Sequence, residues 1–213
     1  MNRLYLCLLK QSITRTFKEK GAIEITAETR IMQKIACNFQ RSLDRISKRK
    51  KQFLSHCVDN EISMGELFED CINCTKTKTC FLARGTKFRV WGKRHTSRLD
   101  FALRDKSGDM LLIAEAKMHD REDVHLQNDI SRLTFFTCKE VKRFDNISWG
   151  CFLFFRTKPD KKKFCKMYVI HQGKFTNSYM LDLKNIDEGW ISCDVSTLAT
   201  LKGDKKMKME FNR

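Results

Sequence analysis

The stretch RLDFALRDKSGDMLLIAEAK, Arg98–Lys117, decides the fold of this chain because it predicts a β-hairpin. Its first arm is 98–104 and its second is 110–117, and apolar residues recur along both arms. The run DKSGD between them, 105–109, consists of residues that favour turns. The two arms are therefore expected to pair as adjacent antiparallel strands.

Three charged side chains lie within this hairpin. Glu115 and Lys117 end the apolar run LLIA, residues 111–114, and Asp100 lies between two apolar residues. Because strand side chains alternate between faces, Glu115 and Lys117 emerge on one face, and Asp100 approaches them if the arms pair with little stagger. Charges that end a core strand are costly unless they are paired or functional. The arrangement can hold a divalent cation beside an ammonium group; a solvated strand end or a structural ion pair is the alternative.

Composition limits the class of protein. The 213 residues suffice for one sizeable domain with its own core. Lys and Arg total 42 against 26 for Asp and Glu, a formal charge of +16, which favours a polyanionic partner, either nucleic acid or an anionic membrane surface. No apolar run is long enough to span a membrane, and no signal peptide is expected. The 10 irregularly spaced cysteines then predict free thiols in a reducing intracellular compartment, the cytoplasm or the nucleus.

Apolar periodicity predicts helices before and after the hairpin. The clearest stripe recurs every three or four residues through Ile31–Ile46. A second helix is predicted from Ser63, because Ser63 and Glu66 have the form of a capping box. A third is predicted from Asp123 to about Val141. The apolar run at residues 4–9 could be a buried strand or a short helix, which periodicity does not separate.

Further strands are predicted around the hairpin. TKFRVW, residues 86–91, alternates polar and apolar side chains, whereas GCFLFFRT, residues 150–157, is a continuous apolar run typical of a strand buried on both faces. KMYVIH, residues 166–171, predicts one more strand. The order helix, strand, hairpin, helix, strand, strand predicts an α/β fold in which helices cover the faces of a mixed central sheet.

Asp100 followed by Glu115-Ala116-Lys117, on neighbouring strands of this order of elements, resembles the PD-(D/E)xK nuclease superfamily. The resemblance implies a restriction-endonuclease-like core (α-β-β-β-α-β) and a Mg²⁺- or Mn²⁺-dependent phosphodiesterase. It implies that the metal is held by Asp100, Glu115 and the main-chain carbonyl of Ala116. It also implies that Lys117 is the catalytic lysine.

The chemistry of these residue types agrees with that expectation. Phosphodiester hydrolysis needs a cation that neutralises charge on the phosphorus and lowers the pKa of an attacking water. Mg²⁺ takes oxygen ligands and keeps several waters, so two carboxylates and a carbonyl suffice. A partly desolvated Lys117 could orient or deprotonate that water, or stabilise the transition state as a cation.

A further acid is implied by the same resemblance. Many members add a Glu from the helix before the first strand, and Glu66 holds the matching position, with Glu28 as the alternative. Leu99 stands where the name of the motif has Pro. The resemblance covers roughly residues 63–171.

The domain organisation is expected to be simple. An N-terminal basic helical extension, 1–58, would pack on a nuclease core, 59–171, and a C-terminal extension with a Lys-rich tail, 172–213, would follow. The single proline of the chain leaves no Pro-rich linker that would mark a boundary between separate domains. We therefore expect one compact domain overall.

The cysteines offer a second kind of metal site. Cys71, Cys74 and Cys80, with His56 or Cys57 nearby, could supply the ligands of a structural Zn²⁺. One CxxC pair without a second is a weak indication, and free thiols in a loop are the alternative.

A basic group precedes the acid-and-lysine motif and is suited to contacts with a nucleic-acid backbone. Such contacts bind phosphate without reading sequence, and the group consists of Lys87, Arg89, Lys93, Arg94 and Arg98. Together these features predict an endonuclease that acts on DNA rather than RNA, without a membrane partner, as a monomer or a homodimer. The alternatives are a basic nucleic-acid-binding module of the same fold that does not cleave, and a zinc-stabilised adaptor.

Overall fold

The part of the chain that the computed structural model describes contains two long α-helices, a large β-sheet and a small one. The residues that it describes are 2–19, 27–50, 57–59, 62–63, 98–105, 110–118, 130, 133–134, 136–137, 147, 149–157 and 162–193. Helix α1 spans Asn2–Lys18 and helix α2 spans Glu28–Lys50. The large sheet contains β1 (Cys57–Asp59), β4 (Phe101–Arg104), β5 (Met110–Met118), β6 (Trp149–Arg156), β7 (Phe164–His171), β8 (Lys174–Asp182) and β9 (Trp190–Cys193). The small sheet pairs β2 (Ile62–Ser63) with β3 (Arg98–Leu99), and the short 3-10 helix η4 (Ile186–Glu188) precedes β9.

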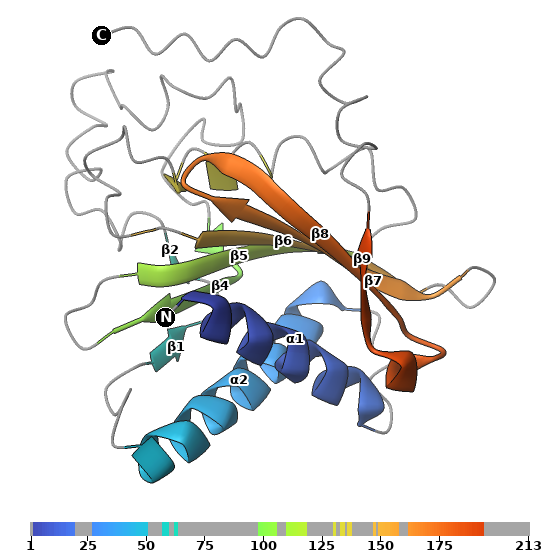
Figure 1. The fold of residues 1–213 in the computed structure, drawn as a ribbon, viewed down its shortest axis with the longest axis horizontal. Helices are drawn as coiled ribbons and strands as arrows, with labels where there is room; N and C mark the ends of the chain where they lie inside the picture. The colour runs from blue at the N-terminus through green and yellow to red at the C-terminus, as the bar shows by residue number, and fades with distance from the viewer. Residues whose placement is uncertain are drawn as a thin grey trace, which may run out of the picture.

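The large sheet has seven strands in the order β1-β4-β5-β6-β7-β8-β9 (Figure 1). Every pair of neighbours is antiparallel except β5 and β6, which are parallel. Parallel neighbours require a crossover connection. The chain between these two strands is helical at Ile130, Leu133, Thr134 and Phe136. The fold is therefore α/β with a mixed sheet, as the sequence predicts.

The hairpin predicted from residues 98–117 is present, with one interruption. Strands β4 and β5 pair antiparallel, with Phe101 opposite Ala114. The first arm breaks at Asp100, because Leu99 pairs with β2 in the small sheet whereas β4, which begins at Phe101, pairs with β1 and β5. Asp100 thus lies where the chain passes from one sheet to the other.

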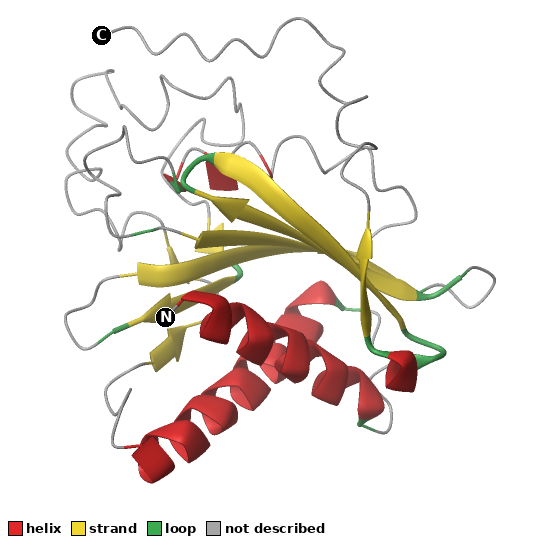
Figure 2. Cartoon of the chain, in the orientation of Figure 1, coloured by secondary structure: helices red, strands yellow, loops and turns green. Residues whose placement is uncertain are grey.

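Helices α1 and α2 cross one another on the same side of the large sheet (Figure 2). The ring of Phe17 in α1 lies 5.7 Å from that of Phe155 in β6, and the ring of Phe39 in α2 lies 5.3 Å from that of Phe101. Burying one such side chain contributes roughly 1.5–3 kcal/mol. Apolar side chains from both helices and from the sheet form one hydrophobic cluster, so the helices share the core of the hairpin and are fixed relative to it.

The sequence predicted one of the two helices clearly and left the other open. Helix α2 confirms the helix predicted from the stripe in Ile31–Ile46, most of whose apolar side chains are buried. The segment whose apolar run could have been a strand or a helix is the 17-residue helix α1. Its buried residues recur at helical spacing: Tyr5, Leu8, Leu9, Ser12, Ile13, Thr16 and Phe17. Some of them are polar, which weakened the apolar periodicity that would have predicted a helix.

The predicted strands at 150–157 and 166–171 are confirmed as β6 and β7, and β6 is buried on both faces. The segment after β7, for which no strand was predicted, forms β8 and β9. Ser63, in β2, pairs with Arg98, in β3, so the backbone of Ser63 is extended at the position where the sequence predicts the start of a helix. The remainder of that predicted helix, the strand at 86–91 and most of the helix at 123–141 lie outside the described residues. Among the described helices, none has both the length and the apolar character needed to cross a membrane.

Candidate functional site

Asp100 is held against the neighbouring strand by its own side chain. Its Oδ2 atom accepts a hydrogen bond of 2.7 Å from the backbone N–H of Ala116 in β5. The ladder between β4 and β5 ends at the pair Phe101 and Ala114, and beyond it the Asp100 carboxylate is the acceptor for the Ala116 N–H. This contact fixes Asp100 beside Glu115 and Lys117, the residues on either side of Ala116.

Asp100 and Glu115 form a pair of carboxyl groups that are in hydrogen-bond contact. Glu115 is only 2% exposed, although it is a charged residue type. Burial raises the pKa of Asp100, and the nearby charge of Glu28 adds to that rise; the Ala116 N–H, the charge of Lys117 and the hydrogen bond with Glu115 act in the opposite direction. Two carboxylates this close repel one another when both are ionised. The repulsion is relieved when the pair shares one proton or binds a cation.

Lys117 is positioned from the other side by the first turn of α2. The Nζ atom of Lys117 lies 3.3 Å from Oε1 of Glu28, and the backbone N–H of Met118 donates a 2.8 Å hydrogen bond to Oε2 of the same carboxylate. The side chains of Lys117 and Glu28 are 32% and 28% exposed. A partly solvated pair of this kind contributes little to stability. Its main effect is to orient the ammonium group beside the two acids.

The structure therefore brings together four of the residues singled out in the sequence, and it adds Glu28. Asp100, Glu115, Ala116 and Lys117 are neighbours at the junction of β4 and β5. Glu28, the alternative helical acid, contacts Lys117. Its place beside the hairpin depends on how α2 packs on the sheet, so the sequence offered it only as the alternative to Glu66.

The remaining predicted site residues are not placed by the structure. Glu66 and the proposed zinc ligands Cys71, Cys74 and Cys80 lie outside the described residues. Four members of the basic group also lie outside the described residues: Lys87, Arg89, Lys93 and Arg94. Of the fifth member, Arg98, only the backbone is described. Within the described part of the chain, no group of three or more His, Cys, Asp or Glu side chains is arranged to hold a metal.

Two buried cysteines of β6 and β7 lie elsewhere in the core. Burial raises the pKa of the Cys151 thiol to about 12 and that of Cys165 well above its ordinary value. The thiolate is the nucleophilic form of cysteine. These two side chains are therefore packing residues of the core.

Comparison of the chain with known protein families, with curated proteins and with solved structures finds no match. The function of the site is therefore argued from its geometry and chemistry.

Proposed function

We propose that this chain is a nuclease that hydrolyses phosphodiester bonds with a divalent cation, Mg²⁺ or Mn²⁺, and that it is an endonuclease acting on DNA. The observation that carries the proposal is the contact between two carboxyl groups from adjacent strands, Asp100 and Glu115, with the ammonium group of Lys117 beside them. A buried acid pair of this kind is costly to maintain without a cation. The formal charge of +16 supports a polyanionic substrate.

The order of elements around the acid pair supports membership of the PD-(D/E)xK superfamily. When β2 and β3, which form the small sheet, are set aside, helix α2, strands β1, β4 and β5, the helical crossover and strand β6 have the order α-β-β-β-α-β. The first three of these strands are antiparallel, and the fourth is parallel to the third. In this proposal the core begins at α2, earlier than residue 63, so that Glu28 replaces Glu66 as the helical acid.

The donor set fits a hard cation. Asp100 and Glu115 supply carboxylate oxygens, and the main-chain carbonyl of Ala116 is the proposed third ligand. Most of Glu115 is shielded from water, which strengthens its interaction with a bound ion. When bound, the cation would offset charge on the phosphate and lower the pKa of an attacking water.

The other residues of the site have roles that follow from their contacts. Lys117 donates from its ammonium group, so it can orient a water molecule and offset the negative charge that develops on the phosphate. Glu28 holds that ammonium group with one carboxylate oxygen and the end of β5 with the other. We assign Glu28 a positioning role, because its contacts are to Lys117 and to the backbone of Met118.

Cleavage assays with the purified chain test the proposal. Supercoiled plasmid, single-stranded DNA and RNA would each be incubated with Mg²⁺ or Mn²⁺. We expect nicking or linearisation of the plasmid, which has no free ends, with loss of activity in chelator and in Lys117→Ala. The control Lys174→Ala removes an exposed lysine at the start of β8 and should retain activity. Tight binding of nucleic acid without cleavage under every condition would favour the non-cleaving module instead.

A further inference from the structure

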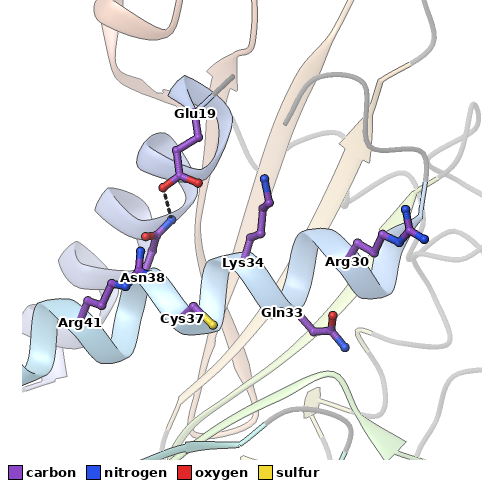
Figure 3. A pocket seen from close by; sticks show the side chains of 7 residues that line it. All are labelled: Glu19, Arg30, Gln33, Lys34, Cys37, Asn38 and Arg41. Carbon is purple, nitrogen blue, oxygen red and sulfur yellow. Dashed lines mark hydrogen bonds between the residues drawn. The ribbon is translucent and has the colours of Figure 1, made fainter. Parts of the chain in front are cut away.

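A groove runs along the outer side of α2, on the face of the helix that does not pack on the sheet (Figure 3). Its volume is about 620 Å³, and the end of α1 forms one wall. Three cations line it against one acid, and the remaining lining residues are polar or small: Glu19, Arg30, Gln33, Lys34, Cys37, Asn38 and Arg41.

Three cations line this groove, Arg30, Lys34 and Arg41, and none of them is paired with an acid among the residues that the structure describes. Lys18, Lys117 and Lys162 each form an ion pair with a carboxylate. Between described residues, no ion pair involves Arg30, Lys34 or Arg41. Their positive charge is therefore available to a ligand.

The wall of the groove is held in place by buried hydrogen bonds. The Nδ2 atom of Asn38, which is 2% exposed, donates to Oγ1 of Thr16 at 3.1 Å and to Oε1 of Glu19 at 3.4 Å. Figure 3 shows the second bond as the link between α1 and α2. A carboxylate oxygen accepts hydrogen bonds, so the contact with Glu19 identifies the Asn38 atom that faces it as the donor nitrogen Nδ2. The acid of the groove is thus held toward Asn38, and the spacing of the two helices is fixed beneath the three cations.

We infer that the groove lined by Arg30, Lys34 and Arg41 binds the phosphate backbone of a nucleic-acid strand. The helix rises about 16 Å between Arg30 and Arg41, a length matched by roughly five stacked nucleotides. Arginine binds phosphate through two parallel hydrogen bonds, and lysine binds it as a point charge. Such contacts add affinity without reading sequence.

The same groove is poorly suited to a membrane surface. Membrane-binding helices insert large apolar side chains beside their cations. None of the groove residues is large and apolar. Among the described residues, the exposed large apolar side chain is Ile191 in β9, which does not line the groove.

The inference shares the nucleic-acid partner with the proposed function, but it does not depend on cleavage. Glu28, which contacts Lys117, precedes Arg30 by two residues on α2. The groove therefore begins within one helical turn of Glu28, which contacts the lysine of the proposed site. A strand bound in it would remain attached while another part of the same molecule reaches Asp100 and Glu115.

Binding in chelator, where no cation-dependent cleavage occurs, tests the groove. Labelled single-stranded and duplex oligonucleotides would be titrated with wild type and with Arg30→Gln/Lys34→Gln/Arg41→Gln at several salt concentrations. We expect a loss of roughly hundredfold in affinity at 0.15 M salt, and a slope of log K against log salt that is shallower by about 2.7 for the duplex and by about 2.1 for the single strand.

The matched control is the variant Arg3→Gln/Lys174→Gln/Lys184→Gln, which removes three exposed cations elsewhere on the molecule. It should lose far less affinity. Circular dichroism checks that both triple variants fold. If the groove variant does not fold, the single variant Lys34→Glu replaces it. Equal losses in the two triple variants would mean that only net charge matters, which overturns the inference. Selective loss of binding to anionic vesicles or to polyglutamate, with nucleic-acid binding unchanged, would overturn it as well.

The outcomes for the groove and for the nuclease are distinguishable. If wild type cleaves nothing but its binding depends on the groove, the proposed function fails and the inference stands. If cleavage depends on Lys117 while the groove variant binds as well as wild type, the inference fails and the proposed function stands.

Discussion

Replacing Glu115 by Gln tests the acid pair directly. The Glu115 side chain is 2% exposed and is in hydrogen-bond contact with Asp100. Two full negative charges about 4 Å apart repel by roughly 4 kcal/mol at an effective dielectric constant near 20. In the metal-free protein a shared proton relieves this repulsion, at a free-energy cost near neutral pH. Glutamine keeps the size of the side chain and removes its charge. We therefore expect the free energy of unfolding of the metal-free protein to rise by about 1–3 kcal/mol.

The assay is thermal unfolding at pH 7, followed by circular dichroism, with chelator or with Mn²⁺. For a chain of this size 1 kcal/mol shifts the melting temperature by about 2–4 °C, so the metal-free variant should melt about 2–12 °C higher than wild type. Mn²⁺ at a hundred times its Kd should stabilise wild type by about 2.7 kcal/mol, and the variant should lose most of that gain. Glu188→Gln makes the same change at an exposed position in η4 and should alter neither value.

The opposite result has a clear meaning. If Glu115→Gln lowers the melting temperature of the metal-free protein, and if Mn²⁺ leaves the wild-type melting temperature unchanged, then the carboxylate belongs to a structural network. The acid pair would then hold no cation, and the proposed function would lose its main support.

Three further outcomes follow from the contacts described above. Glu28→Gln removes the charge of the carboxylate that contacts the Lys117 ammonium group, so we expect the single-turnover cleavage rate to fall roughly 10–100-fold while substrate affinity is retained. Because burial raises the pKa of Asp100 above its ordinary 3.8, its contribution to metal-free stability is complete below about pH 4 and is lost as the pH rises through the folded-state pKa. Urea unfolding between pH 4 and pH 8 should show this decline in wild type and a flatter profile in Asp100→Asn. Gly150→Ala would place a Cβ atom 3.2 Å from Cγ2 of Thr137, and overpacking of this kind costs about 1–3 kcal/mol. The melting temperature should fall without any change in the shift produced by Mn²⁺.

Local pattern was sufficient for the elements whose burial is regular. The uninterrupted apolar run of β6 predicts a strand covered on both faces, and its side chains are buried on both faces. The stripe of α2 is likewise regular, because its apolar side chains meet the sheet at every turn. β8 was missed because most of its side chains are exposed or half-buried, so that the apolar signal is diluted. β9, with no fully buried residue, was missed for the same reason.

The candidate site divides in the same way. Asp100, Glu115 and Lys117 could be singled out because each is a charge within or at the end of an apolar strand, and a hairpin with a short turn brings such residues together. The choice between Glu28 and Glu66 could not be made from spacing alone, since each lies in a predicted helix. Packing of α2 on the sheet places Glu28 beside Lys117.

By itself, the sequence determined the hairpin, the buried strands, the long amphipathic helix and the acidic and basic residues at the end of β5, because each is encoded by neighbours along the chain. Only the tertiary structure decided that Asp100 bonds to the backbone of Ala116, that Glu28 orients Lys117, and that three cations of α2 line a groove beside α1. These contacts join segments far apart in the sequence. Their geometry is set by how two helices pack on one sheet, which no local pattern specifies.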